Sequence, residues 1–117
     1  MEKNELDGIK RENQINKLVS NARAIISNAI GMPMGSLKME RIILWINDIE
    51  LLTEIQLDVF SSYNNQTNEY PIGVDRLGYN KDYLLELDVK LHEITHSFKN
   101  LIIEKCFEII QKYGKQK

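Results

Sequence analysis

The sequence predicts an all-α protein, a bundle of about four helices that ends in a long C-terminal helix. Two observations carry this prediction. Apolar residues recur at three- and four-residue steps along most of the chain, and no stretch alternates apolar and polar residues as a half-buried strand does. The 117 residues fit a single domain, 1–117, and we expect its ends to fray over residues 1–8 and 114–117.

The first predicted helix spans residues 9–30 and should end at Gly31, because glycine commonly follows the last turn of a helix. Its apolar residues return at the spacing of one buried helix face, which places it against the core. The residues of this face are Ile15, Leu18, Val19, Ala22, Ile25, Ile26 and Ala29.

The second predicted helix begins at Leu37, where Ser36 can cap it, because Pro33 and Gly35 just before it are expected to break any helix. It contains R-I-I-L-W-I, which is apolar almost all the way round and must be covered on several sides. Its Trp45 is either a core residue or the centre of a helical dimer face. For the second alternative we predict an interface formed by Trp45, Ile42, Ile46, Met32 and Met34.

A short third helix is predicted to open at a capping box of Thr53 and Gln56 and to end near Ser62. The polar stretch Y-N-N-Q-T-N-E-Y-P-I-G then forms a loop. Asn80 can cap the last helix, in which Cys106, the single cysteine, is expected to be buried. The apolar stripe of this helix is Leu84, Leu87, Leu91, Ile94, Phe98, Ile102, Cys106, Ile109 and Tyr113.

The composition of the chain excludes some classes of function. Apolar residues make up 43% and charged residues 27% of the chain, which is typical of a folded globular protein. The net charge of −2 and the interspersed charges offer no basic face for a phosphate backbone, so we expect no nucleic-acid partner. The N-terminus lacks the apolar run of a signal peptide, and no run approaches the ~20 residues that span a bilayer. We expect a cytoplasmic protein without a membrane partner.

One sequence motif suggests a catalytic or metal-binding site. H-E-I-T-H, residues 92–96, contains both histidines of the chain and resembles the H-E-x-x-H signature of zinc peptidases. The resemblance implies zinc ligands at His92 and His96 and a general base at Glu93. However, the helix continues past the motif, and its later glutamates lie too far along it to complete a tetrahedral site. We therefore expect a coincidental match and no cofactor. The alternatives are a zinc hydrolase and a non-catalytic metal site formed by Asp88, His92 and His96.

Three arginines, Arg23, Arg41 and Arg76, lie beside apolar runs or a turn rather than at the lysine-rich ends of the chain. The five donors of a guanidinium suit paired carboxylates or a bound anion. We expect intramolecular salt bridges at these residues, and an anion or nucleotide site is the alternative.

The stretches A-R-A-I-I-S-N-A-I-G-M-P-M-G (residues 22–35) and Y-P-I-G-V-D-R-L-G-Y (residues 70–79) resemble a family of small helical bacterial proteins of unknown function. The similarity extends from Ala22 to Tyr113, and Tyr79 stands where the family pattern has Trp. It implies a bacterial, cytoplasmic, all-α protein with Arg23 and Arg76 in the common framework. It implies no activity, cofactor or catalytic residue.

Together these observations lead us to expect a non-enzymatic helical protein that acts by protein–protein binding and forms a homo-oligomer. An immunity or antitoxin-like protein, or another regulatory partner, is the concrete form suggested by analogy. The alternatives are a zinc-dependent hydrolase that uses H-E-I-T-H and a small sensor of anions or nucleotides.

Overall fold

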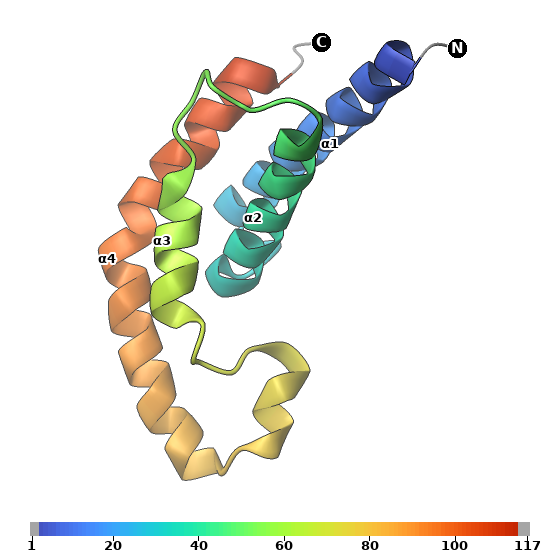
Figure 1. Cartoon of the computed structure of the whole chain (residues 1–117). Helices are drawn as coiled ribbons and strands as arrows, with labels where there is room; N and C mark the ends of the chain where they lie inside the picture. Colours follow the sequence, from blue (N-terminus) through green and yellow to red (C-terminus); the bar gives the residue numbers. More distant parts are fainter. Residues whose placement is uncertain (1–2, 115–117) are drawn as a thin grey trace.

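The computed structural model describes residues 3–114, and these form the predicted all-α bundle. The described helices are α1 (Lys3–Ile26), α2 (Met32–Ile49), α3 (Asp58–Thr67) and α4 (Lys81–Tyr113), with the short 3₁₀ helix η1 (Gly73–Gly78) before α4. Successive α-helices run in opposite directions (Figure 1), and α1 and α3 each pack against both α2 and α4. The topology is therefore up-down-up-down. None of these helices has the length and apolar character needed to cross a membrane.

Helix α1 starts and ends earlier than predicted. It already includes residues 3–8 of the segment expected to fray, whereas residues 1–2 and 115–117 lie outside the described part of the chain. The helix stops at Ile26 because Asn28 adopts a φ of 62°. Asparagine tolerates this left-handed conformation better than most residues. The turn is closed by the amide of Ala29, which donates to the carbonyl of Ala24 at 2.9 Å. The predicted end at Gly31 is therefore wrong.

Helix α2 begins at Met32, so the prediction of a helix break at Pro33 and Gly35 is also wrong. Pro33 stands in the first turn, where an amide proton has no partner within the helix. Gly35 is buried, and a Cβ atom there would lie 2.6 Å from Cγ1 of Ile25. Glycine is required here because α1 and α2 approach closely. Ser36, the predicted cap, is instead buried inside the helix.

Two buried asparagines hold the start of α2. The Nδ2 atom of Asn21 in α1 donates to the carbonyl of Gly35 at 2.9 Å. From the other side, Nδ2 of Asn64 in α3 donates to the carbonyl of Ser36 at 3.0 Å and to Oε1 of Glu40 at 2.9 Å. Because buried amides require partners, these bonds fix the position of α2 between α1 and α3.

Helix α3 begins at Asp58 and ends at Thr67, so the predicted capping box of Thr53 and Gln56 does not open it. Both residues lie in an irregular connection, and part of the predicted polar loop is helical. The N-cap residue Leu57 provides no side-chain hydrogen bond, so the sequence carried no capping signal at the true start.

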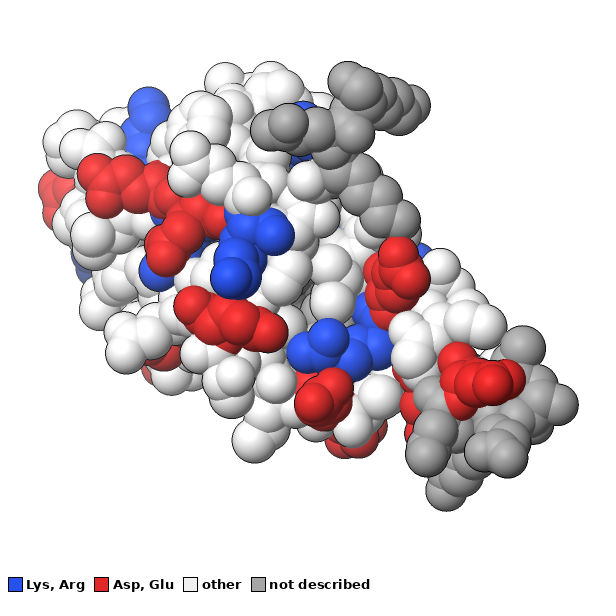
Figure 2. Space-filling model, turned by 90° about the horizontal axis from the view of Figure 1, so that it is seen from above, with Lys and Arg blue, Asp and Glu red and all other residues white. Residues whose placement is uncertain are grey.

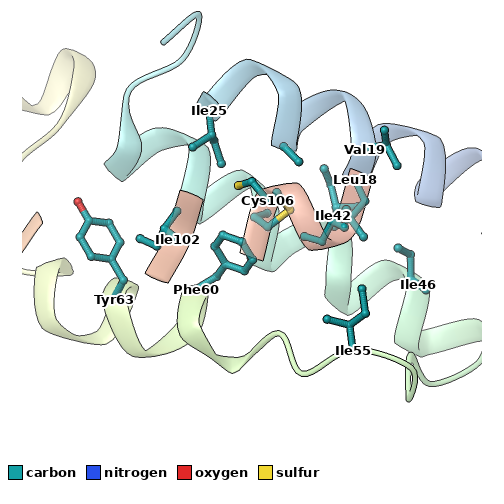
Figure 3. Packing of buried hydrophobic residues seen from close by; sticks show 13 residues of the cluster. Leu18, Val19, Ile25, Ile42, Ile46, Ile55, Phe60, Tyr63, Ile102 and Cys106 are labelled. Atoms are coloured by element: carbon teal, nitrogen blue, oxygen red, sulfur yellow. The ribbon is translucent and has the colours of Figure 1, made fainter. Parts of the chain in front are cut away.

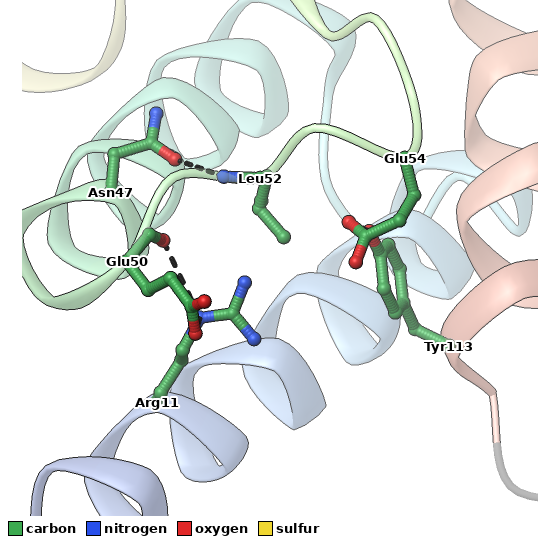
Figure 4. Close-up of polar contacts among 6 residues, drawn as sticks. All are labelled: Arg11, Asn47, Glu50, Leu52, Glu54 and Tyr113. Carbon is green, nitrogen blue, oxygen red and sulfur yellow. Dashed lines mark hydrogen bonds and ion pairs between the residues drawn. The ribbon is translucent and has the colours of Figure 1, made fainter. Parts of the chain in front are cut away.

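Polar contacts to three helices hold the connection between α2 and α3 (Figure 4). Oδ1 of Asn47 accepts a hydrogen bond from the amide of Leu52 at 2.9 Å. The hydroxyl of Tyr113 donates to Oε2 of Glu54 at 2.8 Å, which lowers the pKa of that carboxyl. Nε of Arg11 donates to the carbonyl of Glu50 at 3.4 Å. The connection is thus tied to α2, α4 and α1.

The core lies where all four helices meet (Figure 3). It includes Leu18 from α1, Ile46 from α2 and Phe60 from α3, each fully buried. The predicted burial of Cys106 is confirmed, and the loss of solvent raises the pKa of its thiol to about 12. Tyr63 extends this core along α4, because its ring packs edge-on against Phe98 at 5.5 Å between centroids and its hydroxyl hydrogen-bonds that of Thr95 at 2.7 Å.

The predicted cap of α4 is confirmed, since Oδ1 of Asn80 accepts a hydrogen bond from the amide of Asp82 at 2.8 Å. Its predicted stripe is fully buried only at Ile102, Cys106 and Ile109. No residue from 74 to 101 is buried. Residues 68–93, which we call the arm, extend past the ends of α1 and α2 (Figure 1). The molecule is accordingly elongated, with a radius of gyration of 16.1 Å where a compact domain of this length has about 13 Å.

Candidate functional site

The two histidines of H-E-I-T-H lie on the exposed side of α4, as does Glu93. Asp88, the additional ligand of the alternative metal site, is instead held by Arg76 through two hydrogen bonds of 2.7 and 2.8 Å. Within residues 3–114, no group of three or more His, Cys, Asp or Glu side chains is arranged to hold a metal ion. The fold therefore brings His92 and His96 together but directs Asp88 to a different partner.

The Arg76–Asp88 pair connects η1 to the first part of α4. Each Nη atom of the guanidinium donates to a different carboxylate oxygen, the strongest geometry for such a pair. These hydrogen bonds lower the pKa of Asp88 and raise the pKa of Arg76. Both side chains are partly exposed, so solvent screens their attraction. The pair serves mainly to orient η1.

Replacing Arg76 with glutamine is expected to raise the pKa of Asp88 toward the ordinary value of about 3.9, because the donors that stabilise the carboxylate are lost. The folded pKa is depressed, so the stabilisation by the pair is present above the unfolded value and disappears as the pH falls through the folded value. A carbon-detected NMR titration of the Asp88 carboxyl measures this. Arg23→Gln is the control, and an equal shift in both variants would contradict the assignment.

The three arginines do not converge, so the predicted cluster is corrected. Arg76 pairs with Asp88 on the arm, and the Arg23 guanidinium lies beside Gly114, just past the end of α4. Arg41 lines an open groove of about 580 Å³ between α1 and α2. The structure thus separates the three guanidinium groups, because Arg23 lies in the last turn of α1, Arg41 in the middle of α2 and Arg76 in η1.

The predicted interface also requires correction. Ile42 and Ile46 are 2% and 0% exposed and belong to the core, because they lie on the side of α2 that faces the other helices. Met32 is partly buried and packs against that core. Of the predicted set, only Trp45 and Met34 are well exposed, at 48% and 49%.

The outward side of α2 carries a second apolar stripe, which we call the α2 face. The exposed leucines Leu37 and Leu44 join Met34 and Trp45 on it. The spacing of these residues, together with two exposed charges, is that of one helix face. The α2 face consists of Met34, Leu37, Arg41, Leu44, Trp45 and Asp48.

The arm carries the most exposed apolar side chains of the described chain. Val74 and Leu77 on η1 are 80% and 87% exposed, and residues three apart in a 3₁₀ helix point the same way. At the tip, the rings of Tyr79 and Tyr83 stack at 6.1 Å between centroids. We call this set the arm surface: Val74, Leu77, Tyr79, Tyr83, Leu85 and Val89.

Sequence reasoning missed the arm surface because it assigned residues 63–73 to a loop and judged only the spacing of α4. One signal was present: valine and leucine stand three apart in G-V-D-R-L-G, between two glycines. Figure 2 shows the molecule from above, at the end opposite the arm, where Lys and Arg side chains lie among Asp and Glu side chains.

Comparison of the chain with protein-family models, with curated proteins and with solved structures gave no match. The family that residues 22–35 and 70–79 resemble therefore stays an expectation, and the two exposed apolar surfaces are the basis for assigning a function.

Proposed function

We propose that this is a non-enzymatic cytoplasmic protein that acts by binding another protein through its arm, as an immunity or antitoxin-like or regulatory partner does. The main observation behind the proposal is the exposure of Val74 and Leu77 on η1. The part of α4 that belongs to the arm contains no buried residue either. Large apolar side chains exposed together on one segment are candidates for an interaction site.

The total surface supports this proposal. The chain exposes 8184 Å², whereas a compact monomer of 13.7 kDa exposes about 6,600 Å². The difference of about 1,600 Å² is about twice the area that each partner contributes to a standard protein–protein interface. The arm contributes to this excess, because none of its residues from 74 to 93 is buried.

The charges around the arm surface indicate the kind of partner. The carboxylates of Glu69, Asp75, Asp82 and Glu86 are all exposed there. The cations of the same segment are fewer, and Arg76 among them is already paired with Asp88. Because opposite charges at an interface rim speed association and select partners, the partner should present an apolar patch with a basic rim.

The test is affinity isolation of the tagged protein, produced at its native level in its own host cell, followed by quantitative mass spectrometry. We compare the wild type with the double variant Val74→Asp/Leu77→Asp. The matched control is Leu101→Asp/Phe107→Asp, which adds the same charge at two α4 residues that are 55% and 53% exposed. Circular dichroism checks that every variant remains helical.

A partner retained by the wild type and by the control, but lost from the Val74/Leu77 variant, is the expected result. A partner that remains with the Val74/Leu77 variant would assign binding to another surface. Isolation of the protein without any stoichiometric partner would overturn the proposed function.

A further inference from the structure

The α2 face carries two charges that the fold leaves without partners. Among the described residues, no ion pair or hydrogen bond engages the side chain of Arg41 or of Asp48, and both residues are exposed. Between them stand Leu44 and Trp45, which are 62% and 48% exposed. An apolar centre with one positive and one negative end is an unusual surface for a helix that faces only water.

The four residues are arranged symmetrically along the helix. Positions 41, 44, 45 and 48 have the spacing i, i+3, i+4 and i+7, which forms one compact patch on a single side. Arg41 and Asp48 stand two turns apart, about 10.5 Å along the axis, and the midpoint falls between Leu44 and Trp45. The spacing of the patch is therefore the same from either end, and its two ends carry opposite charges.

We infer that the α2 face binds the α2 face of a second copy of this chain, with the two helices antiparallel about a two-fold axis between Leu44 and Trp45. In this arrangement Arg41 of each copy lies opposite Asp48 of the other, so that two ion pairs form at once. Leu44 and Trp45 of both copies meet at the centre. A two-fold interface requires such self-complementarity, in which each residue and its partner exchange roles.

Charge also excludes the parallel alternative. If the two helices ran in the same direction, Arg41 would face Arg41, and Asp48 would face Asp48. Like charges placed against each other in an interface cost enough to reject a wrong pairing. Only the antiparallel arrangement places every charge of the patch beside an opposite one.

The α2 face runs from Met34 to Asp48, which is about 21 Å along the helix. A standard interface takes about 800 Å² from each partner, a patch about 28 Å across, so the α2 face matches the smaller interfaces of weak dimers. The inference goes beyond the arm surface. The centre of the dimer lies in the second half of α2, which runs away from the arm (Figure 1), whereas Leu37 in the first half lines a pocket together with Tyr70 and Asp75 of the arm.

The test is sedimentation velocity on purified full-length protein at several concentrations up to about 100 μM, where weak dimers of micromolar affinity are visible. We compare the wild type, Arg41→Asp, Asp48→Arg, the double exchange Arg41→Asp/Asp48→Arg, and an equimolar mixture of the two single variants. Lys90→Asp and Asp82→Arg, on the arm, are the controls for the change in net charge. Trp45 is the only tryptophan, so its emission reports directly whether the patch becomes covered.

The wild type is expected at twice the 13.7 kDa mass of one chain, with a blue shift of Trp45 emission as the concentration rises. Each single variant places like charges together twice, so its dissociation constant should rise at least 100-fold. The double exchange and the mixture both restore opposite pairs and should dimerise again, whereas the two controls should behave as wild type.

Three results would overturn the inference. They are a monomeric wild type at 100 μM, single variants that dimerise as well as the wild type, and a double exchange and mixture that stay monomeric. The arm proposal is tested separately, because the Val74→Asp/Leu77→Asp variant retains the α2 face. A wild-type protein that stays monomeric but still retains its arm partner would therefore reject only the present inference.

Discussion

Replacing Phe60 with alanine is expected to lower the free energy of unfolding by about 3–5 kcal/mol. The side chain is fully buried and belongs to the same cluster as Ile42 and Cys106 (Figure 3). Its removal loses the transfer energy of an aromatic ring and leaves a cavity that helices fixed by other contacts cannot fill. A domain of this size is stabilised by roughly 5–15 kcal/mol, so the loss takes a large part of the total.

The matched control for Phe60 is Phe107→Ala, because that ring on α4 is 53% exposed. Substitution at an exposed site usually changes stability by about 0.5 kcal/mol or less. Urea unfolding followed by circular dichroism gives both values from the same experiment. Similar losses for the two phenylalanines would mean that Phe60 does not occupy the core of the bundle.

The second large effect is expected at Gly35, where alanine should lower the free energy of unfolding by about 1–3 kcal/mol. A Cβ atom at this position would lie 2.6 Å from Cγ1 and 3.0 Å from Cδ1 of Ile25, which is itself only 1% exposed. Neither side chain nor helix can move without disturbing the core. The hydrogen bond from Asn21 to the carbonyl of Gly35 would also be strained by any separation of α1 from α2.

Gly8 is the control for Gly35, since it also lies inside a helix but has no atom within 4 Å of the position that a Cβ atom would take. Gly8→Ala should raise the free energy of unfolding by about 0.5–1 kcal/mol, because alanine loses less backbone entropy in a helix. The two glycine substitutions are therefore expected to act in opposite directions in the same chemical denaturation assay. A stabilising effect at both positions would show that α1 and α2 do not approach closely at Gly35.

The two sides of α2 explain why its sequence is apolar almost all the way round. The inward side packs against α1 and α3 and contains Met39, Ile42 and Ile46. The outward side lines open pockets with residues of α1 at Trp45 and of the arm at Leu37, and it still carries exposed apolar residues. The sequence predicted cover on several sides of this helix, but the outward side stays exposed within residues 3–114, and the sequence could not assign residues to the two sides. The assignment depends on which neighbours the helix has.

Periodicity by itself determined the fold class and the identity of most core residues. The helical spacing of Leu18, Ala22 and Ile25 on α1 and of Ile102, Cys106 and Ile109 on α4 predicted their burial, because a helix fixes which residues share a side. The cap at Asn80 was likewise predictable, since a capping side chain contacts only amides two or three residues ahead. Helix periodicity and helix capping both depend on residues that are close together in the sequence.

Contacts between residues far apart in the chain were decided only by the tertiary structure. Gly35 was interpreted as a helix breaker because the sequence does not show that Ile25 needs the space of its missing side chain. Asp88 was considered as a zinc ligand, yet the fold places it against Arg76, twelve residues away. The exposure of Val74 and Leu77 follows from the length of α4, whose first turns extend beyond the other helices and leave the arm without cover.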